Sequence, residues 1–594
     1  MAASLSHSLE IVRRIPVGAP DGWLDDVHPV LRRVYAARGV LNPAAAATRL
    51  SGLLPPQSLP GLASAVSLLA EAIARRWRIV VAADFDCDGA CGAALAVRGL
   101  RMLGATEVGF AVPHRMRHGY GLSPALVDTL QPAPDLIVTV DNGIASHAGV
   151  AAAKARGCKV IVTDHHLPGA SLPDADAIVN PNLGWKRDFD EKCVHGRAPC
   201  DPCNLDACKN LCGAGVMFYL LLALRVELFG DDPGREGRPD LASLLDLVAL
   251  ATVADLVPLD RNNRILVEAG LRRIRAGRAC PGLTALIDVA GRDPRKLDAA
   301  DLGYALGPRI NAAGRLEDMT LGIECLLTDD GSRARELATI LHGINGERRD
   351  VQDAMVAEAE TMLARIDANQ CGVSLFDPAW HPGVVGLVAS RIKERLHRPV
   401  VAFAPADRES RGMLRGSARS IPGLHIRDAL AELDARHPGL IPVFGGHAMA
   451  AGLSLREEDF ARFSEHFDAV VGERVAPESL RPVLHSDGEL APADFDLGLA
   501  RQLRGAGPWG QGFPPPLFDN VFECAGWRRV GAQQRHLRLD LRDPRDGRMH
   551  AAIRFDAEDE PPEGATLRVA YELALDEWRG TERLGLRVRH LQAA

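Results

Sequence analysis

The sequence predicts an α/β protein of several domains, built around a doubly wound parallel sheet. Continuous apolar strands alternate with helical segments in the first third of the chain, which is typical of a parallel sheet covered on both faces. A second strand–helix–strand pattern starts at Gly372, and strands without intervening helices follow after residue 475. The chain has 594 residues, which exceeds the ~100–200 residues of a typical domain.

The first domain is expected to span residues 76–325, after a helical segment over residues 1–75 that prolines interrupt. Its strands are short and mainly apolar, so we expect them inside the sheet rather than at the surface. The expected strands cover residues 79–83, 108–112, 136–140 and 159–163. A helix is expected over 91–103, and residues 241–275 are expected to be mainly helical.

The second half of the chain is expected to hold two further domains. The charged helical pattern over 326–370 predicts a long connecting helix, although a packed helix pair would show the same pattern. A second α/β domain is expected over 371–474, with strands at 373–376 and 400–403 and a helix at 384–396. Residues 475–594 predict a small β-barrel, with strands at 537–541, 551–555, 567–571 and 584–588.

Composition narrows the class of protein only slightly. The formal net charge is −8, so the charge of the whole molecule does not indicate a nucleic-acid binder. It does not exclude one, because acids gathered around metals can mask local basic patches. The first 18 residues lack the apolar core of a secretory signal, and the apolar stretch 216–224 is shorter than the ~20 residues of a membrane span. We therefore expect a cytoplasmic protein with no membrane partner, whose twelve cysteines are free or metal-bound.

Three of the early strands are followed by side chains that can bind metals. In an open α/β sheet, sites form beyond the carboxyl ends of the strands, so residues far apart in the sequence are expected to meet there. Asp255, which interrupts a later apolar segment, is a further candidate. The candidates at the strand ends are Asp84, Asp86 and Asp88, then Asp141, and then Asp164, His165 and His166.

The stretch from Asp84 to Gly89 also matches the start of a calcium-binding EF-hand loop. That loop needs a glutamate at its twelfth position, where this chain has Leu95, so we reject the calcium interpretation. Helix caps and turns are another explanation for single acids, but three strand ends and a histidine pair together favour a metal site. Mixed carboxylate and imidazole ligands suit Mn²⁺, and also accept Mg²⁺ or Zn²⁺. Two such ions ~3.5–4 Å apart would offset the repulsion between the acids and promote phosphoester hydrolysis.

These motifs resemble those of the DHH phosphoesterase superfamily. The resemblance rests on DFDCDG at 84–89, DNGI at 141–144, DHH at 164–166 and the pair Ala254-Asp255. Further matching segments are GPRINAAGR at 307–315, WHPGVVG at 380–386, GSARS at 416–420, GGH at 445–447 and GPWGQ at 507–511. Within the superfamily, this order resembles the bacterial exonucleases specific for single-stranded DNA. The resemblance implies DHH, DHHA1 and OB-fold domains in sequence.

The resemblance also implies roles for individual residues. Asp86, Asp88, Asp141, His165 and Asp255 would be metal ligands, with Asp141 bridging two ions. Asp84 and His166 would lie beside them as a ligand, a proton-transfer group or a phosphate contact. The residues implied in phosphate or DNA binding are Arg115, Arg309, Asn311, Arg315, Ser417, Arg419, Gly446 and His447.

The implied activity is 5′-to-3′ hydrolysis of single-stranded DNA that releases 5′-mononucleotides, in recombination and repair. A single-strand-binding protein and a RecQ-type helicase are the partners that the resemblance implies. One alternative is a DHH-type phosphodiesterase acting on oligoribonucleotides or cyclic dinucleotides. The other is a non-catalytic binder of single strands. The barrel could bind such strands through aromatic stacking, although aromatic residues such as Trp509 and Phe513 are more often part of a barrel's core, and none is assigned to the site.

An insertion rich in cysteine departs from the superfamily pattern. Five cysteines and a histidine lie within 193–212, and four of them could hold a structural Zn²⁺. An iron–sulfur cluster fits the spacing less well, and a surface loop with free thiols is the remaining alternative. The cysteines are Cys193, Cys200, Cys203, Cys208 and Cys212.

Overall fold

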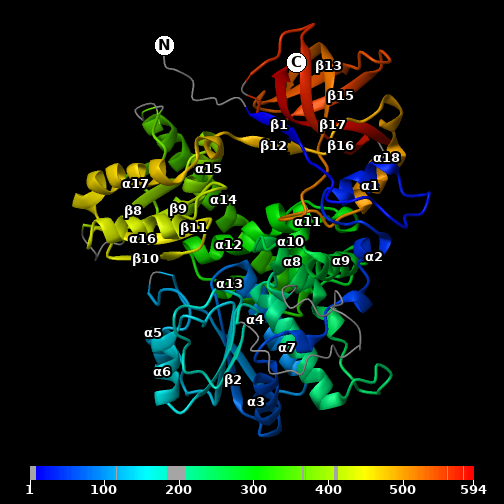
Figure 1. Ribbon diagram of the computed structural model, residues 1–594. Coiled ribbons are helices and arrows are strands. Elements are labelled where there is room, and N and C mark those ends of the chain that lie inside the picture. Colours follow the sequence, from blue (N-terminus) through cyan, green and yellow to red (C-terminus); the bar gives the residue numbers. More distant parts are fainter. Residues whose placement is uncertain are drawn as a thin grey trace. The chain divides into compact units, whose positions relative to one another are not determined.

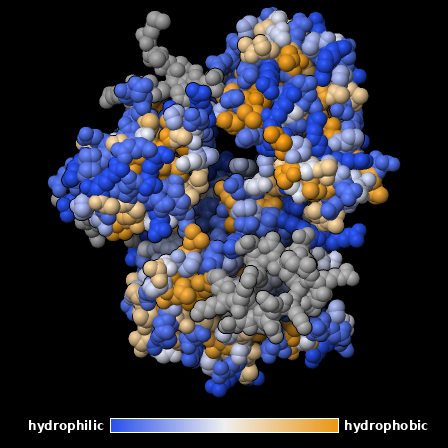
Figure 2. All heavy atoms as spheres, in the orientation of Figure 1, coloured by the Kyte–Doolittle hydropathy of each residue, from blue (hydrophilic) through white to orange (hydrophobic). Residues whose placement is uncertain are grey.

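The protein divides into two compact units in a computed structural model (Figure 1). The structure describes residues 9–115, 117–183, 208–363, 367, 369–406, 412–557, 559–578 and 581–594. The larger unit holds Arg13–His342 and His485–Ala594, and the smaller holds Gly343–Leu484 with the described residues up to Val12. The face shown in Figure 2 is mostly hydrophilic in each unit, with apolar side chains in small groups.

The larger unit contains the predicted parallel sheet. Its five strands run in the order β3–β2–β4–β5–β6, and every neighbouring pair is parallel. Because helices cover both faces, the central strands are buried along their length. The strands are β2 (Arg78–Ala83), β3 (Glu107–Ala111), β4 (Leu136–Val140), β5 (Lys159–Thr163) and β6 (Ala177–Val179). The four strands predicted from the sequence are confirmed.

The helices of the larger unit pack around this sheet and beside it. The helix after the first strand, α4, begins at Cys87, four residues before the predicted start, because Asp86 caps it. The predicted helical region 241–275 holds α8 (Leu245–Ala254) and α9 (Arg261–Arg275). The other helices are α1 (Pro29–Ala36), α2 (Pro43–Ala46), α3 (Leu62–Ala74), α4 (Cys87–Met102), α5 (Pro124–Thr129), α6 (His147–Ala155), α7 (Gly213–Phe229), α10 (Pro281–Val289), α11 (Ala299–Asp301), α12 (Gly307–Leu316), α13 (Thr320–Leu327) and α18 (Leu497–Gly505).

A closed five-stranded barrel forms the C-terminal part of the larger unit. Its strand order is β13–β14–β15–β17–β16, which confirms the predicted barrel and adds β13, a strand the sequence analysis missed. Trp509 stacks on Phe513 with ring centroids 4.9 Å apart, and both pack near Tyr35, so these two aromatics belong to the core. The strands are β13 (Phe518–Val530), β14 (His536–Arg542), β15 (Met549–Arg554), β16 (Thr566–Trp578) and β17 (Thr581–Ala593).

The smaller unit is built on a mixed sheet with the order β10–β11–β9–β8–β7. β7 and β8 are parallel, and the other pairs are antiparallel. The three antiparallel strands were not predicted, because their sequences alternate small and polar residues rather than forming apolar runs. The elements are β7 (Val373–Phe376), α15 (Val385–Leu396), β8 (Val400–Pro405), β9 (Met413–Arg419), α16 (Ile426–Arg436), β10 (Val443–Gly446), β11 (Ala450–Arg456) and α17 (Phe460–Arg474).

Two further elements bear on the predicted domain limits. The helix α14 (Gly331–Leu363) has 33 residues and lies within the segment predicted to connect the domains. The expected helical N-terminal segment contains a strand, β1 (Glu10–Arg13), which pairs with β12 (Val483–Ser486). Among the described helices, none combines the length and the apolar character that a membrane span requires.

Candidate active site

The carboxyl ends of three neighbouring strands bring the predicted ligands together. β2, β4 and β5 are adjacent and parallel, so the loops that follow them share one edge of the sheet. Three groups of ligand atoms form there, each with its atoms within 4.8 Å of one another. They are Asp84, Asp86 and Asp141; Asp88, His165 and Asp255; and Asp141, His165 and His166.

Each of these three loops starts in the same way. The backbone N–H of Asp84 donates to the carbonyl of Val140, and that of Asp141 donates to Thr163, at 3.3 and 3.1 Å. Asp164 makes the equivalent bond to Val179 at 3.1 Å. The first residue after each strand therefore still belongs to the ladder, which fixes the position from which its side chain enters the site.

The start of α4 positions the first acidic motif. Asp86 is the N-cap, and its Oδ1 accepts the N–H of Gly89 at 3.0 Å. The N–H of Cys87 donates to Oδ1 of Asn311 at 2.8 Å, so Asn311, a predicted phosphate contact, also holds the beginning of this helix. A Cβ on Gly89 would lie 2.4 Å from the carbonyl oxygen of Asp84, so only glycine lets the helix turn back so closely on Asp84.

The start of α7 holds Asp88 in place. Its carboxylate accepts the N–H of Gly213 at 2.6 Å and that of Ala214 at 2.9 Å, which is a helix N-terminus binding an anion. A Cβ on Gly213 would lie 2.4 Å from Cβ of Asp141. The sequence does not predict this contact, because nothing local to Gly213 connects it with motifs more than 70 residues earlier.

Asp141 lies at the centre of the site. Its φ of +63° is left-handed, which is strained for a residue other than glycine. Its Oδ1 lies 3.1 Å from Nε2 of His165, which is also 3.5 Å from Oδ2 of Asp255 and 4.0 Å from Oδ2 of Asp88. Asp255 reaches the group from the end of α8, where it is the C-cap.

His166 is oriented by Asp164. Oδ1 of Asp164 lies 2.7 Å from Nδ1 of His166, and Oδ2 accepts the N–H of Ile144 at 2.9 Å. Burial lowers the pKa of His166, but the hydrogen bond and charge of Asp164 outweigh burial and raise it. The hydroxyl of Tyr120 lies 3.5 Å from Nε2 of His166. Asp164, a candidate ligand from the sequence, thus orients His166, and Tyr120 was not predicted as a site residue.

The electrostatics of the group favour a bound cation. Burial raises the pKa of Asp84, Asp141 and Asp255 well above the usual range, and neighbouring carboxylates raise it further. Burial and then Asp86 raise the pKa of Asp88 to about 6. Oδ1 of Asp141 is buried and accepts no hydrogen bond from the residues that the structure describes. A divalent cation would offset this repulsion and use that lone pair, so the donor set fits Mn²⁺ or Mg²⁺.

Of the predicted phosphate-binding arginines in the larger unit, Arg115 is at the site. Its guanidinium carbon lies 4.0 Å from the centre of the Phe85 ring, and its Nε donates to the carbonyl of Gly314 at 3.1 Å. Arg309 is buried, with its guanidinium bonded to Ala305 and His342. Arg315 lies in the last turn of α12.

The other predicted phosphate contacts gather at one end of the sheet in the smaller unit. Nη1 of Arg419 donates to Oγ of Ser417 at 2.9 Å, and Arg419 pairs across the sheet with Ala450. The N–H of His447 donates to the carbonyl of Ala450 at 2.8 Å. Gly446 has a φ of +148°, and a Cβ there would lie 2.4 Å from the same carbonyl oxygen, which explains the glycine.

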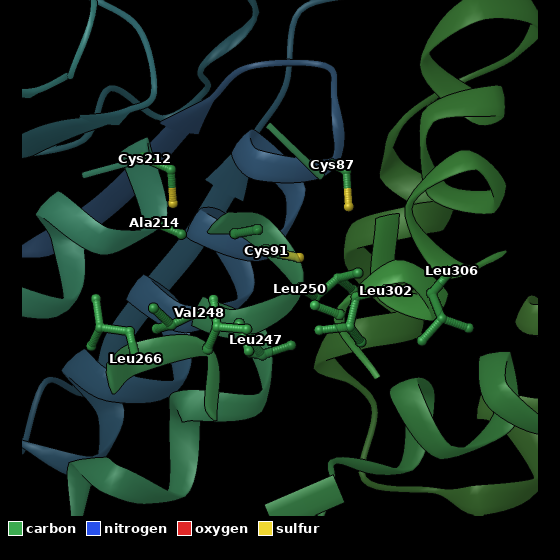
Figure 3. Packing of buried hydrophobic residues seen from close by; sticks show 14 of the residues in the cluster. Cys87, Cys91, Cys212, Ala214, Leu247, Val248, Leu250, Leu266, Leu302 and Leu306 are labelled. Atoms are coloured by element: carbon green, nitrogen blue, oxygen red, sulfur yellow. The ribbon is translucent and has the colours of Figure 1, made fainter. Parts of the chain in front are cut away.

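Two of the five predicted zinc ligands lie in the described part of the chain, and both are buried. Cys212 caps α7, where its sulfur accepts the N–H of Gly215 at 3.4 Å and lies 3.6 Å from Oγ1 of Thr252. Figure 3 shows Cys212 with Cys87 and Cys91 within the apolar cluster that joins α4, α7 and α8. Cys208 belongs to the same cluster, and Cys193, Cys200 and Cys203 lie outside the described residues.

Three family models match the chain in order. The DHH family N-terminal domain matches residues 78–252, the DHHA1 domain matches 368–473, and the RecJ OB domain matches 486–590. The single-stranded-DNA-specific exonuclease RecJ of Escherichia coli is 48% identical over 570 residues, which cover 94% of this chain and 95% of that protein. The chain belongs to the RecJ family.

Solved structures of RecJ share the fold as well as the sequence. RecJ from Thermus thermophilus in complex with Mn²⁺ has a TM-score of 0.79 and 31% identity, covering 99% of this chain and 79% of that one. The complex with Mg²⁺ has a TM-score of 0.74 and 30% identity, covering 99% and 78%. RecJ proteins therefore bind divalent cations, as the donor set at Asp141 indicates. The DHH match ends three residues before Asp255, and the structure places this predicted ligand beside His165.

Proposed function

We propose that the protein is a metal-dependent exonuclease that degrades single-stranded DNA from its 5′ end and releases 5′-mononucleotides, in recombination and repair. The observation that carries the proposal is that Asp141 belongs to two groups of ligand atoms, one with Asp84 and Asp86 and one with His165 and His166, in a chain whose RecJ relatives are named for single-strand-specific exonuclease activity. Two divalent ions, when bound, stabilise the attacking and leaving oxygens of a phosphodiester.

The spacing of the ligand atoms indicates which residues would hold each ion. Asp84 and Asp86 would hold one ion, and Asp88, His165 and Asp255 the other, with Asp141 bridging them. The N–H groups of Gly213 and Ala214 keep the Asp88 carboxylate fixed, so it need not reorganise when the charge of the substrate arrives.

His166 stands beside the ions as a positioned donor. Asp164 holds Nδ1 and leaves Nε2 toward Tyr120, so Nε2 would donate a proton or a hydrogen bond to the phosphate. Arg115, fixed over Phe85, would contact the same strand. In the smaller unit, we propose Ser417, Arg419, Gly446 and His447 as an additional phosphate-binding group, since backbone N–H groups and a guanidinium both suit phosphate.

The experiment is a degradation assay with Mn²⁺ and DNA labelled at the 5′ or 3′ end, single- or double-stranded. We expect the 5′ label of single-stranded DNA to be released at once as a mononucleotide. Double-stranded DNA should resist degradation. Asp141→Asn, which keeps the shape but removes the shared charge, should lose at least ~100-fold in rate. Equal degradation of duplex, or a fully active Asp141→Asn, would contradict the proposal. Linear oligoribonucleotides and cyclic dinucleotides as substrates test the alternative phosphodiesterase activity.

A structural Zn²⁺ in the cysteine-rich insertion is a separate proposal. Because Cys212 caps α7 within the core, the ligands would come from Cys193, His195, Cys200, Cys203 and Cys208. Zinc should remain at one ion per chain after Mn²⁺ is removed by a mild chelator, and Cys200→Ser with Cys203→Ser should abolish it. Protein that retains no zinc after this treatment would end the proposal. A single-strand-binding protein and a RecQ-type helicase remain predicted partners.

A further inference from the structure

A cavity of about 350 Å³ lies in the larger unit at the end of α4 that is remote from the carboxylates. The ends of α4, α9 and α13 and the beginnings of α8 and α10 bound it. Asp88 is in the first turn of α4 and Arg101 in the last. At ~1.5 Å per residue they are roughly 20 Å apart, so this cavity is distinct from the metal site.

The cavity is lined by more positive than negative charge. Four arginines contribute to it, and the acids among its lining residues are Asp246 and Asp329. Asp329 is paired with one of the arginines at 2.9 Å. Asp246 accepts the N–H groups of Leu247 and Cys280 at 2.9 and 2.7 Å, and burial raises its pKa. Two positive charges are therefore left in excess. The arginines are Arg98, Arg101, Arg273 and Arg278.

Arg273 and Arg278 are held in place by each other. Nη2 of Arg273 donates to the carbonyl of Arg278, and the N–H of Arg278 donates to the carbonyl of Arg273, each at 3.0 Å. Nε of Arg273 is buried and has no hydrogen-bond acceptor within the described part of the chain. The protein thus fixes this guanidinium near Asp246, whose pKa burial raises and its charge lowers, and leaves its Nε without an acceptor among the described residues.

The remaining walls suit a small organic anion. The first residue of α10, Pro281, lines the cavity, and a helix N-terminus adds partial positive charge. Met102, Leu247 and Leu327 supply apolar surface. The volume is within the range of small-molecule sites.

We propose that this cavity binds a phosphate monoester of about the size of a nucleoside monophosphate. The guanidinium groups of Arg101 and Arg278 would take the phosphate in forked hydrogen bonds, and the apolar wall would take the organic part. A phosphate dianion matches the two excess positive charges. The proposal does not depend on the nuclease activity.

The test is calorimetric titration of the full chain in EDTA, so that the carboxylate site cannot bind phosphate through a metal. The probes are deoxyadenosine monophosphate, inorganic phosphate and deoxyadenosine. The variant Arg101→Gln with Arg278→Gln removes two exposed guanidinium groups. The control is Arg272→Gln, whose side chain pairs with Glu268 on the same helix as Arg273 and does not line this cavity.

We expect saturable binding of one monophosphate per chain, weakened at least tenfold in the double variant and within twofold of wild type in Arg272→Gln. Asp329→Asn, which removes the negative charge paired with Arg98, should strengthen binding. Monophosphate binding tighter than phosphate shows that the organic part is recognised, and equal binding shows recognition of the phosphate group alone. The proposal is overturned if deoxyadenosine binds as well as its monophosphate, if neither phosphate compound binds, or if the double variant matches wild type.

Discussion

At the scale of single residues, the site depends on glycines as much as on carboxylates. Gly89 lets α4 approach Asp84, and Gly213 lets α7 approach Asp141. Asp141 itself takes a left-handed conformation, and its carboxylate belongs to two of the three groups of ligand atoms. Backbone strain of this kind persists when the surrounding structure imposes it, here through the hydrogen bond from Asp141 to Thr163.

Gly213→Ala should reduce activity while leaving the protein folded. The new methyl group would overlap Asp141 and separate the start of α7 from both Asp88 and Asp141, and a shift of ~1 Å at a catalytic group can cost roughly 100-fold in kcat/KM. Steady-state degradation of a single-stranded oligonucleotide measures this. Gly343→Ala, where a Cβ meets nothing within 4 Å, is the matched control. Unchanged activity in Gly213→Ala would show that this close approach is not required.

The acids of the site were predictable from the sequence, but their supports were not. Asp84, Asp141 and His165 follow apolar strands. Because sites in an open α/β sheet form at the carboxyl ends of the strands, their proximity could be predicted. Arg309 and Asn311 lie in an equally suggestive motif, yet Arg309 is buried against His342 and Asn311 accepts the N–H of Cys87 at the start of α4. Which side chain faces a substrate depends on packing between distant segments, and a local pattern does not contain that information.

At the scale of elements, apolar runs were sufficient to predict the parallel strands, whereas β9, β10 and β11 went unrecognised. Their small and polar residues, such as Gly416, Ser417 and Gly445, give no hydrophobic signal. Strand β13 was missed for a related reason, since it carries the buried acid Asp519. Arg13, Ser486 and Arg568 all donate to that carboxylate, and these bonds explain a charge inside the barrel wall.

Asp519→Asn should destabilise the larger unit by about 2–3 kcal/mol at neutral pH, because a buried carboxylate loses charge-assisted bonds. Burial raises the pKa of Asp519, but Arg13, Ser486 and Arg568 outweigh burial and lower it. The stabilisation is therefore present above the unfolded value of about 3.9 and is lost as pH falls toward the folded value.

Urea unfolding of the wild type and Asp519→Asn at several pH values measures this effect. The difference between the two should shrink below about pH 4. Glu489→Gln, which removes the half-exposed partner of Arg13, should cost less than ~1 kcal/mol. A difference between wild type and Asp519→Asn that does not change with pH would contradict the electrostatic explanation.

At the scale of the whole molecule, each unit carries its own chemistry. The larger unit holds the complete carboxylate and histidine group together with the barrel, and the smaller unit holds the Arg419 and His447 group. The order of domains was predictable, because each has its own hydrophobic pattern. The boundaries of the two compact units differ from the predicted domain boundaries, because the larger unit is formed from two separate parts of the chain. The order of residues in the sequence does not show such long-range packing.

Two groups of ligand atoms share Asp141, and we propose that the site holds two ions. Titration of the metal-free full chain with Mn²⁺, followed by electron paramagnetic resonance, tests it most directly. We predict two ions per chain with a spin-coupled signal, one uncoupled ion in Asp255→Asn, and weakened binding of both ions in Asp141→Asn. A single ion in the wild-type protein, or two uncoupled ions that Asp141→Asn leaves unchanged, would contradict the shared site.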